Sequence, residues 1–275
     1  MIGTTQPRRR HARRNYVAIG LGLYVVTFMI FLLLPILVVV VVSFSSATYI
    51  AFPLPGFSLQ WYARVFDYAP FMDSLSVSVQ IALLSAILGT ALGVPAAMWA
   101  ARSPSMAAGA VSTFLLAPIS VPAIVLGFSL LYMLAAMGLG VSFLSLLITH
   151  TVVSIPYIAR TVLAVYRAVP PDFEEAAAVL GASRWKAFWT VTLPMIRPGI
   201  FAGGMFAVLI SLDNLPLSFF FGSSTTNTLP VIMLSYMQNQ FDPSIAAIST
   251  IQMLIAVVTL LVVNALYGID KLTAA

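Results

Sequence analysis

The feature that most limits the possible folds of this chain is a long stretch without charge. Between Arg102 and Arg160 there is no Asp, Glu, Lys or Arg. A helix needs about 20 apolar residues to cross a bilayer, so this stretch suits two crossings better than one. Glycine lowers helix stability, and we place the turn at the Met-Gly-Leu-Gly sequence of residues 137–140. The predicted spans are residues 107–135 and 140–162.

Four further segments have a similar length and composition. Residues 16–43 and 74–101 are uncharged, and apolar segments lie near 199–221 and 245–268. The first exceeds the roughly 7–15 apolar residues of a signal sequence, so we expect it to be retained. Only 8% of the residues are charged, against about 25% in soluble domains. The sequence therefore predicts one domain, an all-α integral membrane protein with six transmembrane helices.

Positive charge is distributed unevenly between the segments that join these spans. With both termini in the cytoplasm, Arg64 is the single Lys or Arg that falls on the outer side. The cytoplasmic side collects Arg8, Arg9, Arg10, Arg13, Arg14, Arg102, Arg160, Arg167, Arg184, Lys186, Arg197 and Lys271. This asymmetry follows the positive-inside rule. We expect the basic tail, residues 1–15, to be cytoplasmic and to contact anionic membrane lipid rather than nucleic acid.

Several kinds of chemistry lack their residues in this sequence. The chain has no cysteine, and its two histidines, His11 and His150, lie far apart. We therefore predict no disulfide, no metal site and no catalytic residue. A P-loop needs GxxxxGK followed by Ser or Thr, whereas Lys186 and Lys271 are followed by Ala and Leu. The chain should not hydrolyse ATP and should hold no cofactor of its own.

The larger of the two outer segments, about residues 44–73, is rich in turns and aromatic residues. This composition predicts a short interfacial helix that follows a proline turn and carries Trp61 and Tyr62. The other outer segment covers about residues 222–244. In the second span Gly89 and Gly93 have the GxxxG spacing that favours close packing of helices.

The segment that follows the fourth span predicts a short capped helix. Pro170 and Pro171 end the preceding helix. Asp172 is placed to cap the new helix, and Glu175 three residues later completes a capping-box-like pair. Gly181 is placed to end it in a left-handed turn.

A second helix is predicted to begin near Ser183 and to end before Pro194. One of its faces is aromatic and carries Trp185, Phe188 and Trp189, while Arg184 and Lys186 stay in water. Two short helices that protrude from the membrane on the cytoplasmic side suggest a docking element for another protein.

This loop resembles the EAA loop of ABC importer permeases that depend on a solute-binding protein. The matching residues are Glu175-Ala176-Ala177, then Gly181 after three residues, then Val191-Thr192-Leu193-Pro194 after nine more. The family pattern has Ile where Val191 stands. The resemblance covers roughly residues 15–270, with residues 16–275 as the permease domain and residues 166–197 as the coupling loop.

The resemblance implies a membrane complex with several partners. These are a second homologous permease subunit, two ATPase subunits that hold ATP and Mg, and a periplasmic or extracellular solute-binding protein. It implies a bacterial cytoplasmic (inner) membrane location. It also implies that the loop is a coupling helix seated on the ATPase. Carried over by position, the contact residues are Glu174, Glu175, Ala176, Ala177 and Gly181.

Asp213 is the ionisable residue that stands out within a predicted span. Because a carboxylate in hydrocarbon is costly, it should face the bundle interior or a wet cavity. Pro216 frees a backbone carbonyl near it. Asp213 is either a structural hydrogen-bonding group or a group that attracts a cation along the pathway.

This region is similar to the second permease of spermidine/putrescine-type importers, whose stretch commonly reads Ser-x-Asp-Asp. The candidate pathway residues are Ser211, Asp213, Asn214 and, from an outer Trp-Tyr pair, Trp61. Asn214 replaces the second acid, and Ala123 stands where an acid often follows the proline of the third span. The resemblance implies a small cationic or amine-containing, polyamine-like solute. The two missing carboxylates weaken the case for a dication, so a monocation, an amino-phosphonate, an opine or an amino-acid-like solute is the alternative.

Two other classes of protein compete with an importer permease. A secondary transporter or channel would carry several intramembrane charges for ion coupling, whereas Asp213 stands almost alone. A membrane enzyme would need a nucleophile with its base or a metal site, and the sequence suggests neither.

Overall fold

The computed structural model describes the backbone of residues 8–267 and the side chains of residues 18–262 and 265. Most of the predicted basic tail, with its arginine side chains, and the C-terminal end with Lys271 lie outside the described residues. Within the described range the regular secondary structure is helical, apart from an isolated bridge between Ser45 and Phe57, and short turns and loops join the helices.

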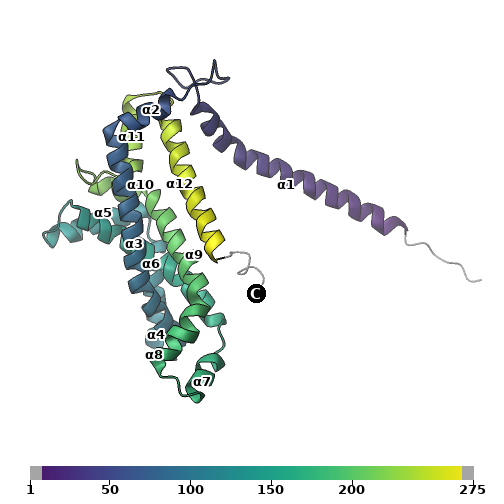
Figure 1. Cartoon of the computed structure of the whole chain (residues 1–275), viewed down its shortest axis with the longest axis vertical. Helices are drawn as coiled ribbons and strands as arrows, with labels where there is room; N and C mark the ends of the chain where they lie inside the picture. Colours follow the sequence, from purple (N-terminus) through teal and green to yellow (C-terminus); the bar gives the residue numbers. More distant parts are fainter. Residues whose placement is uncertain (1–7, 268–275) are drawn as a thin grey trace, which may run out of the picture. The chain divides into compact units, whose positions relative to one another are not determined.

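The helices follow one another as Figure 1 labels them. They are α1 (Arg8–Val42), α2 (Gln60–Asp67), α3 (Ala69–Arg102), α4 (Met106–Ser120), α5 (Ala123–Ala136), α6 (Phe143–Ala168), α7 (Asp172–Val179), α8 (Arg184–Ala187), the π-helix η1 (Phe188–Thr192), α9 (Leu193–Leu212), α10 (Leu215–Ser218), the 3-10 helix η2 (Phe219–Phe221), α11 (Leu229–Asn239) and α12 (Ser244–Tyr267).

The prediction of six apolar spans is confirmed, but one of the six is a bent pair of helices instead of a single helix. Among the described residues five helices are long and apolar enough to cross a membrane: residues 18–42, 69–102, 143–168, 184–212 and 244–262. The sixth candidate is a bent pair, because α4 and α5 meet at an angle of 107°. The prediction of an unbroken third span over 107–135 is wrong, since Pro122 cannot continue the hydrogen bonds of α4.

The turn predicted at residues 137–140 is confirmed, and glycine makes it possible. Gly138 and Gly140 have φ angles of +83° and +50°, a left-handed conformation that side chains disfavour. α6 then begins at Phe143, and the Ser142 side chain caps it by accepting from the Ser145 N–H.

The chain divides into two compact units, Met1–Val65 with Phe241–Ile251 and Phe66–Gln240 with Gln252–Ala275. In the first unit the predicted short outer helix is present as α2. Trp61 on this helix is buried, and its Nε1 donates to the Ser45 carbonyl at 2.8 Å. Arg64 forms an ion pair with Asp242 at 3.4 Å.

The second unit is built around α6, which packs against α3 and α9. Gly89 of α3 faces α6 so closely that a Cβ there would lie 2.9 Å from Ile158 Cδ1. On the other helix Gly203 of α9 would bring a Cβ to 2.7 Å from the Ile158 Cα. The close packing predicted from the GxxxG spacing is thus confirmed for Gly89, and α9 uses small residues against α6 in the same way. Figure 1 shows α7 and α8 at the lower end of this unit.

Candidate functional site

The loop between α6 and α9 contains the predicted short helix, but its capping differs from the prediction. The N-cap residue of α7 is Pro171, and Asp172 lies in the first turn without a side-chain cap bond. The predicted capping box of Asp172 and Glu175 is therefore wrong. The acids Asp172, Glu174 and Glu175 instead stabilise the first turn through the helix dipole. The left-handed stop is confirmed, because Gly181 has φ +83°.

Glu174 connects α7 to the long helices. Its Oε1 accepts hydrogen bonds from the Tyr166 hydroxyl at 2.9 Å and from the Thr192 Oγ1 at 3.0 Å. The Arg102 guanidinium lies 4.4 Å from the centre of the Tyr166 ring, and Arg102 also donates to the Val169 carbonyl at 2.8 Å. The ends of α3, α6 and α7 therefore meet at one junction with η1. Of the five residues predicted to face an ATPase, Glu174 thus turns inward, toward the bundle.

The second short helix of the loop begins as predicted but does not end before Pro194. Ser183 caps it, with its Oγ accepting from the Lys186 N–H at 3.3 Å. The helix then passes through η1 into α9, so residues 184–212 form one helix. Proline removes an N–H from the ladder and crowds the preceding turn. The wider π-helical turn absorbs this defect, and there the Leu193 N–H donates to the Phe188 carbonyl.

The exposed surface of this loop carries a group of apolar side chains. The side chains of Val179 and Leu180 are both 87% exposed, and Trp185 is 70% exposed. Trp185 also stacks on Phe188 with ring centres 5.9 Å apart, and Trp189 completes the predicted aromatic face. Exposed apolar patches on such an element mark interaction surfaces.

A cavity lies where the two interrupted helices of the second unit meet. The first interruption, between α4 and α5, is at Val121 and Pro122. The second, between α9 and α10, is at Asp213 and Asn214. The halves beyond the breaks pack closely, since a Cβ on Gly127 of α5 would lie 3.3 Å from the Leu217 Cα of α10.

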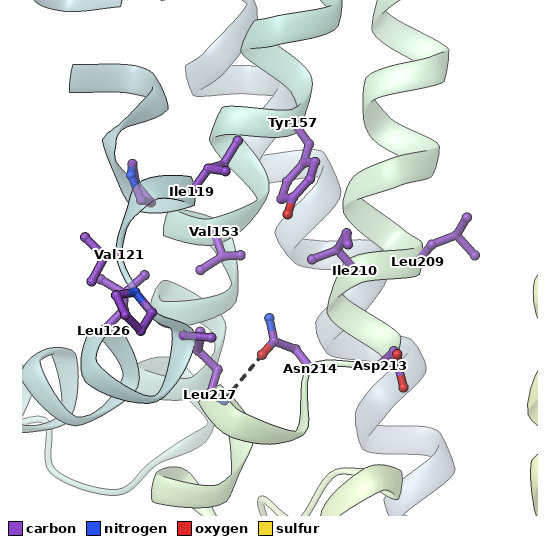
Figure 2. A pocket seen from close by; sticks show the side chains of 13 residues that line it. Ile119, Val121, Leu126, Val153, Tyr157, Leu209, Ile210, Asp213, Asn214 and Leu217 are labelled. Carbon is purple, nitrogen blue, oxygen red and sulfur yellow. Dashed lines mark hydrogen bonds between the residues drawn. The ribbon is translucent and has the colours of Figure 1, made fainter. Parts of the chain in front are cut away.

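The cavity has a volume of about 640 Å³ and is mainly apolar (Figure 2). Its lining consists of Pro118, Ile119, Val121, Pro122, Ala123, Leu126, Val153, Tyr157, Leu209, Ile210, Asp213, Asn214 and Leu217. The polar side chains among these are Tyr157, Asp213 and Asn214. Interrupted helices with a few polar groups at the break are a common construction of transport sites.

The sequence predicts that Asp213 lies inside a membrane-spanning helix, but in the structure it lies just beyond the end of one. α9 ends at Leu212, so the helix does not extend over the whole of the predicted span, residues 199–221, and Asp213 is the exposed C-cap residue of α9. Asn214 caps α10, with its Oδ1 accepting from the Leu217 N–H at 3.3 Å (Figure 2). Pro216 can sit in the first turn of α10 because it needs no N–H there.

The backbone groups freed by this break find partners. The Gln252 Nε2 of α12 donates to the Leu212 carbonyl at 3.2 Å, and the Leu215 N–H donates to the Asp213 carbonyl at 2.9 Å. Irregular backbone at membrane depth persists where such partners or a wet cavity exist. These hydrogen bonds stabilise the interruption between α9 and α10.

Two predicted pathway residues, Ser211 and Trp61, are not among those that line this cavity. Ser211 is buried, and its Oγ lies 2.7 Å from the Nδ1 of His150. Trp61 belongs to the first unit, where its indole bonds to Ser45. The sequence pattern assigns no role to His150 beyond its distance from His11, although an ionisable ring inside an apolar span is itself a functional signal. Its second ring nitrogen, Nε2, lies 3.0 Å from the Ser218 Oγ.

Long apolar helices with interrupted spans around a cavity are typical of membrane transport proteins. The chain belongs to the family of binding-protein-dependent transport system inner membrane components, whose sequence pattern matches residues 93–269. It is therefore the inner-membrane component of a transport system that works with a solute-binding protein.

Named relatives cover most of the chain. It is 29% identical to the putrescine transport system permease protein PotI of Escherichia coli (strain K12), over 80% of this chain and 81% of the relative. It is 30% identical to the spermidine/putrescine transport system permease protein PotC of Haemophilus influenzae, over 82% and 88%. It is 33% identical to the molybdenum transport system permease protein ModB of Mycobacterium bovis, over 69% and 76%.

The fold matches a solved transporter along almost its whole length. A chain of a bacterial ABC transporter involved in the import of the acidic polysaccharide alginate superposes with a TM-score of 0.68. The two share 16% identity, and the match covers 98% of this chain and 100% of that one. This likeness confirms the predicted fold class.

Proposed function

We propose that this chain forms half of the translocation pathway of an ABC importer for a small cationic or amine-containing solute, polyamine-like in its chemistry. A second homologous permease subunit completes the pathway, and two separate ATPase subunits bind ATP with Mg and hydrolyse it. A periplasmic or extracellular binding protein delivers the solute. Both termini lie in the cytoplasm, as the charge asymmetry of the sequence favours.

The observation that carries the cargo proposal is the lining of the cavity between the two helix breaks. The lining includes Asp213, Asn214 and Tyr157, and none of its thirteen residues is basic. A carboxylate attracts an ammonium group, and an apolar wall accommodates its methylene chain. The names of the two polyamine permeases point in the same direction.

The loop that holds α7 and α8 supports the coupling role. Its apolar outer surface, with Val179, Leu180 and Trp185 exposed, suits a cleft on another protein. Glu175 and Ala176 lie on the exposed surface of α7, in position for contact with an ATPase subunit. Since the helix that starts at Arg184 lines the cavity with Leu209 and Ile210, a movement of the loop reaches the solute pathway directly.

An anionic solute is the second candidate, because the relative from Mycobacterium bovis is named as a molybdenum transporter at 33% identity. Binding of an oxyanion uses basic side chains or convergent N–H donors. The basic side chains are missing from this lining, so we favour the cation.

The test is uptake into proteoliposomes that contain the complete complex with its binding protein, with labelled putrescine and labelled molybdate as the two probes. We expect uptake of putrescine, and we expect Asp213→Asn to lower its kcat/KM about tenfold, which corresponds to ~1.4 kcal/mol. Asp67→Asn is the matched control, because Asp67 is an exposed acid outside the cavity lining.

Three outcomes decide between the parts of the proposal. Uptake of molybdate without putrescine would reject the cationic cargo. Wild-type putrescine uptake by Asp213→Asn, normalised to assembled complex, would remove Asp213 from the pathway. An equal loss in Asp67→Asn would show that the effect is not specific to the cavity.

A further inference from the structure

His150 spans the interruption in the helix that leads to the cavity. It lies on α6 and is 1% exposed. Its Nδ1 is 2.7 Å from the Oγ of Ser211, in the last turn of α9, and its Nε2 is 3.0 Å from the Oγ of Ser218, the last residue of α10. One imidazole thus contacts both sides of the break that carries Asp213 and Asn214.

Both ring nitrogens of His150 are satisfied by this arrangement. A neutral imidazole has one N–H donor and one bare acceptor nitrogen, and a serine hydroxyl can play either part. One serine therefore accepts from the ring while the other donates to it. Because each nitrogen needs a partner when it is buried, a displacement of either helix half would leave a buried polar atom unpaired.

α10 needs such support because it is only four residues long. A helix of this length is not stable by itself. Its N-terminus is held by the cap of Asn214, and its side is held by the close approach of Gly127. His150 fixes the far end, at Ser218. Leu217, between these points, is fully buried and lines the cavity.

We propose that His150 is a positioning residue that sets the shape of the solute pathway by holding α9 and α10 in one relation across the break. His150 is not among the residues that line the cavity, so it acts through Ser211 and Ser218 rather than on the solute. This inference rests on the proposed function, since it takes the cavity at Asp213 as the pathway.

The first measurement does not depend on the cargo. The chain has no native cysteine, so Leu217→Cys places a single thiol on α10. Leu217 is 0% exposed, and we expect slow modification of this thiol by a membrane-impermeant thiol reagent in the assembled complex. Adding His150→Phe removes both bonds while keeping a ring, and the labelling rate should rise at least tenfold. Ser218→Ala removes one bond and should raise it about fivefold, the equivalent of ~1 kcal/mol.

The second measurement separates positioning from general damage. In uptake of labelled putrescine we expect Ser211→Ala and Ser218→Ala to raise KM about fivefold, with kcat per assembled complex close to wild type. Thr149→Val is the matched control, because the Thr149 hydroxyl is buried beside His150 and has no hydrogen-bond partner among the described residues. This variant should leave both KM and labelling unchanged.

The outcomes distinguish this proposal from the proposed function. Unchanged labelling of Leu217→Cys in both the His150→Phe and the Ser218→Ala backgrounds would overturn the role of His150. An equal rise of the labelling rate or of KM in Thr149→Val would also overturn the role of His150. If His150→Phe does not assemble, the labelling rate in Ser218→Ala and the KM values of Ser211→Ala and Ser218→Ala test the proposal. Faster labelling together with wild-type uptake by Asp213→Asn would keep the role of His150 in positioning α10 and reject Asp213 as a pathway residue.

Discussion

Removing the carboxylate of Glu174 tests how α7 communicates with the long helices. α7 has no buried residue, so packing alone holds it weakly. Its polar connection to the bundle is the Oε1 of Glu174, which accepts from Tyr166 and Thr192. Glu174→Ala deletes both bonds, and Tyr166→Phe and Thr192→Val delete one each.

The size of the effect follows from these two bonds. A hydrogen bond onto a charged group contributes about 1.5–3 kcal/mol. Glu174 is only half-buried, so we use the lower end and expect Glu174→Ala to cost about 3 kcal/mol at this junction. That shifts the ratio of attached to detached α7 by more than about a hundredfold. Each single partner variant should cost about half as much.

The assay is the number of solute molecules transported per ATP hydrolysed in proteoliposomes with the complete complex. We expect Glu174→Ala to lower this ratio, because the ATPase still binds the apolar outer face of the loop while its movement no longer reaches Tyr166 and Thr192. Glu175→Ala is the matched control. Glu175 is exposed, and its removal should lower ATP hydrolysis and uptake together, with the ratio unchanged. A wild-type ratio in Glu174→Ala, or an equal fall of the ratio in Glu175→Ala, would refute the reasoning.

Three further predictions concern packing, the loop turn and topology. Gly203→Ala should lower the free energy of unfolding by about 1–3 kcal/mol, measured as a lower Tm in detergent. Gly204→Ala is the control and should leave the Tm unchanged, because no atom would lie nearer than 4.0 Å to the added Cβ. Equal Tm values for the two variants would contradict the close packing at Gly203. Gly181→Val should reduce the ATPase activity stimulated by the binding protein, because a β-branched residue resists φ +83°; full stimulation would reject the role of this turn. A single cysteine at Ser183 should be labelled only from the cytoplasm and one at Ser223 only from outside; the reverse would invert the topology.

The features predicted well from the sequence are those set by local composition. Uncharged length marks the spans, and glycine marks the turns at 137–140 and at Gly181, where positive φ angles are observed. The family resemblance through the loop residues was also sufficient to identify the class of protein. These signals are strong because a bilayer excludes charge and a left-handed turn excludes most side chains.

The two helix breaks were harder to predict because they depend on partners far away in the chain. The stretch over residues 199–221 carries no charged residue except Asp213, and nothing in its pattern shows that Gln252 and His150 support an interruption there. Pro194 predicts a helix end, yet the π-helical turn η1 lets the helix continue past it. Ser211 is 61 residues from His150 in sequence, so no local pattern could pair them.

The continuous helix from Arg184 to Leu212 relates the two ends of the proposed mechanism. It has 29 residues, about 43 Å at 1.5 Å per residue, and the breaks that would absorb a displacement lie beyond its end, at Asp213 and Asn214. Near its start Thr192 is bound to Glu174, and at its end Ser211 is bound to His150. A displacement of α8 along the helix axis therefore has to move Ser211 relative to Ser218, or carry α10 with it. The hydrogen bonds of Glu174 connect the loop to this helix, so we expect variants at Glu174 to change coupling. The hydrogen bonds of His150 hold Ser211 and Ser218 in place across the break, so we expect variants at His150 to change solute affinity.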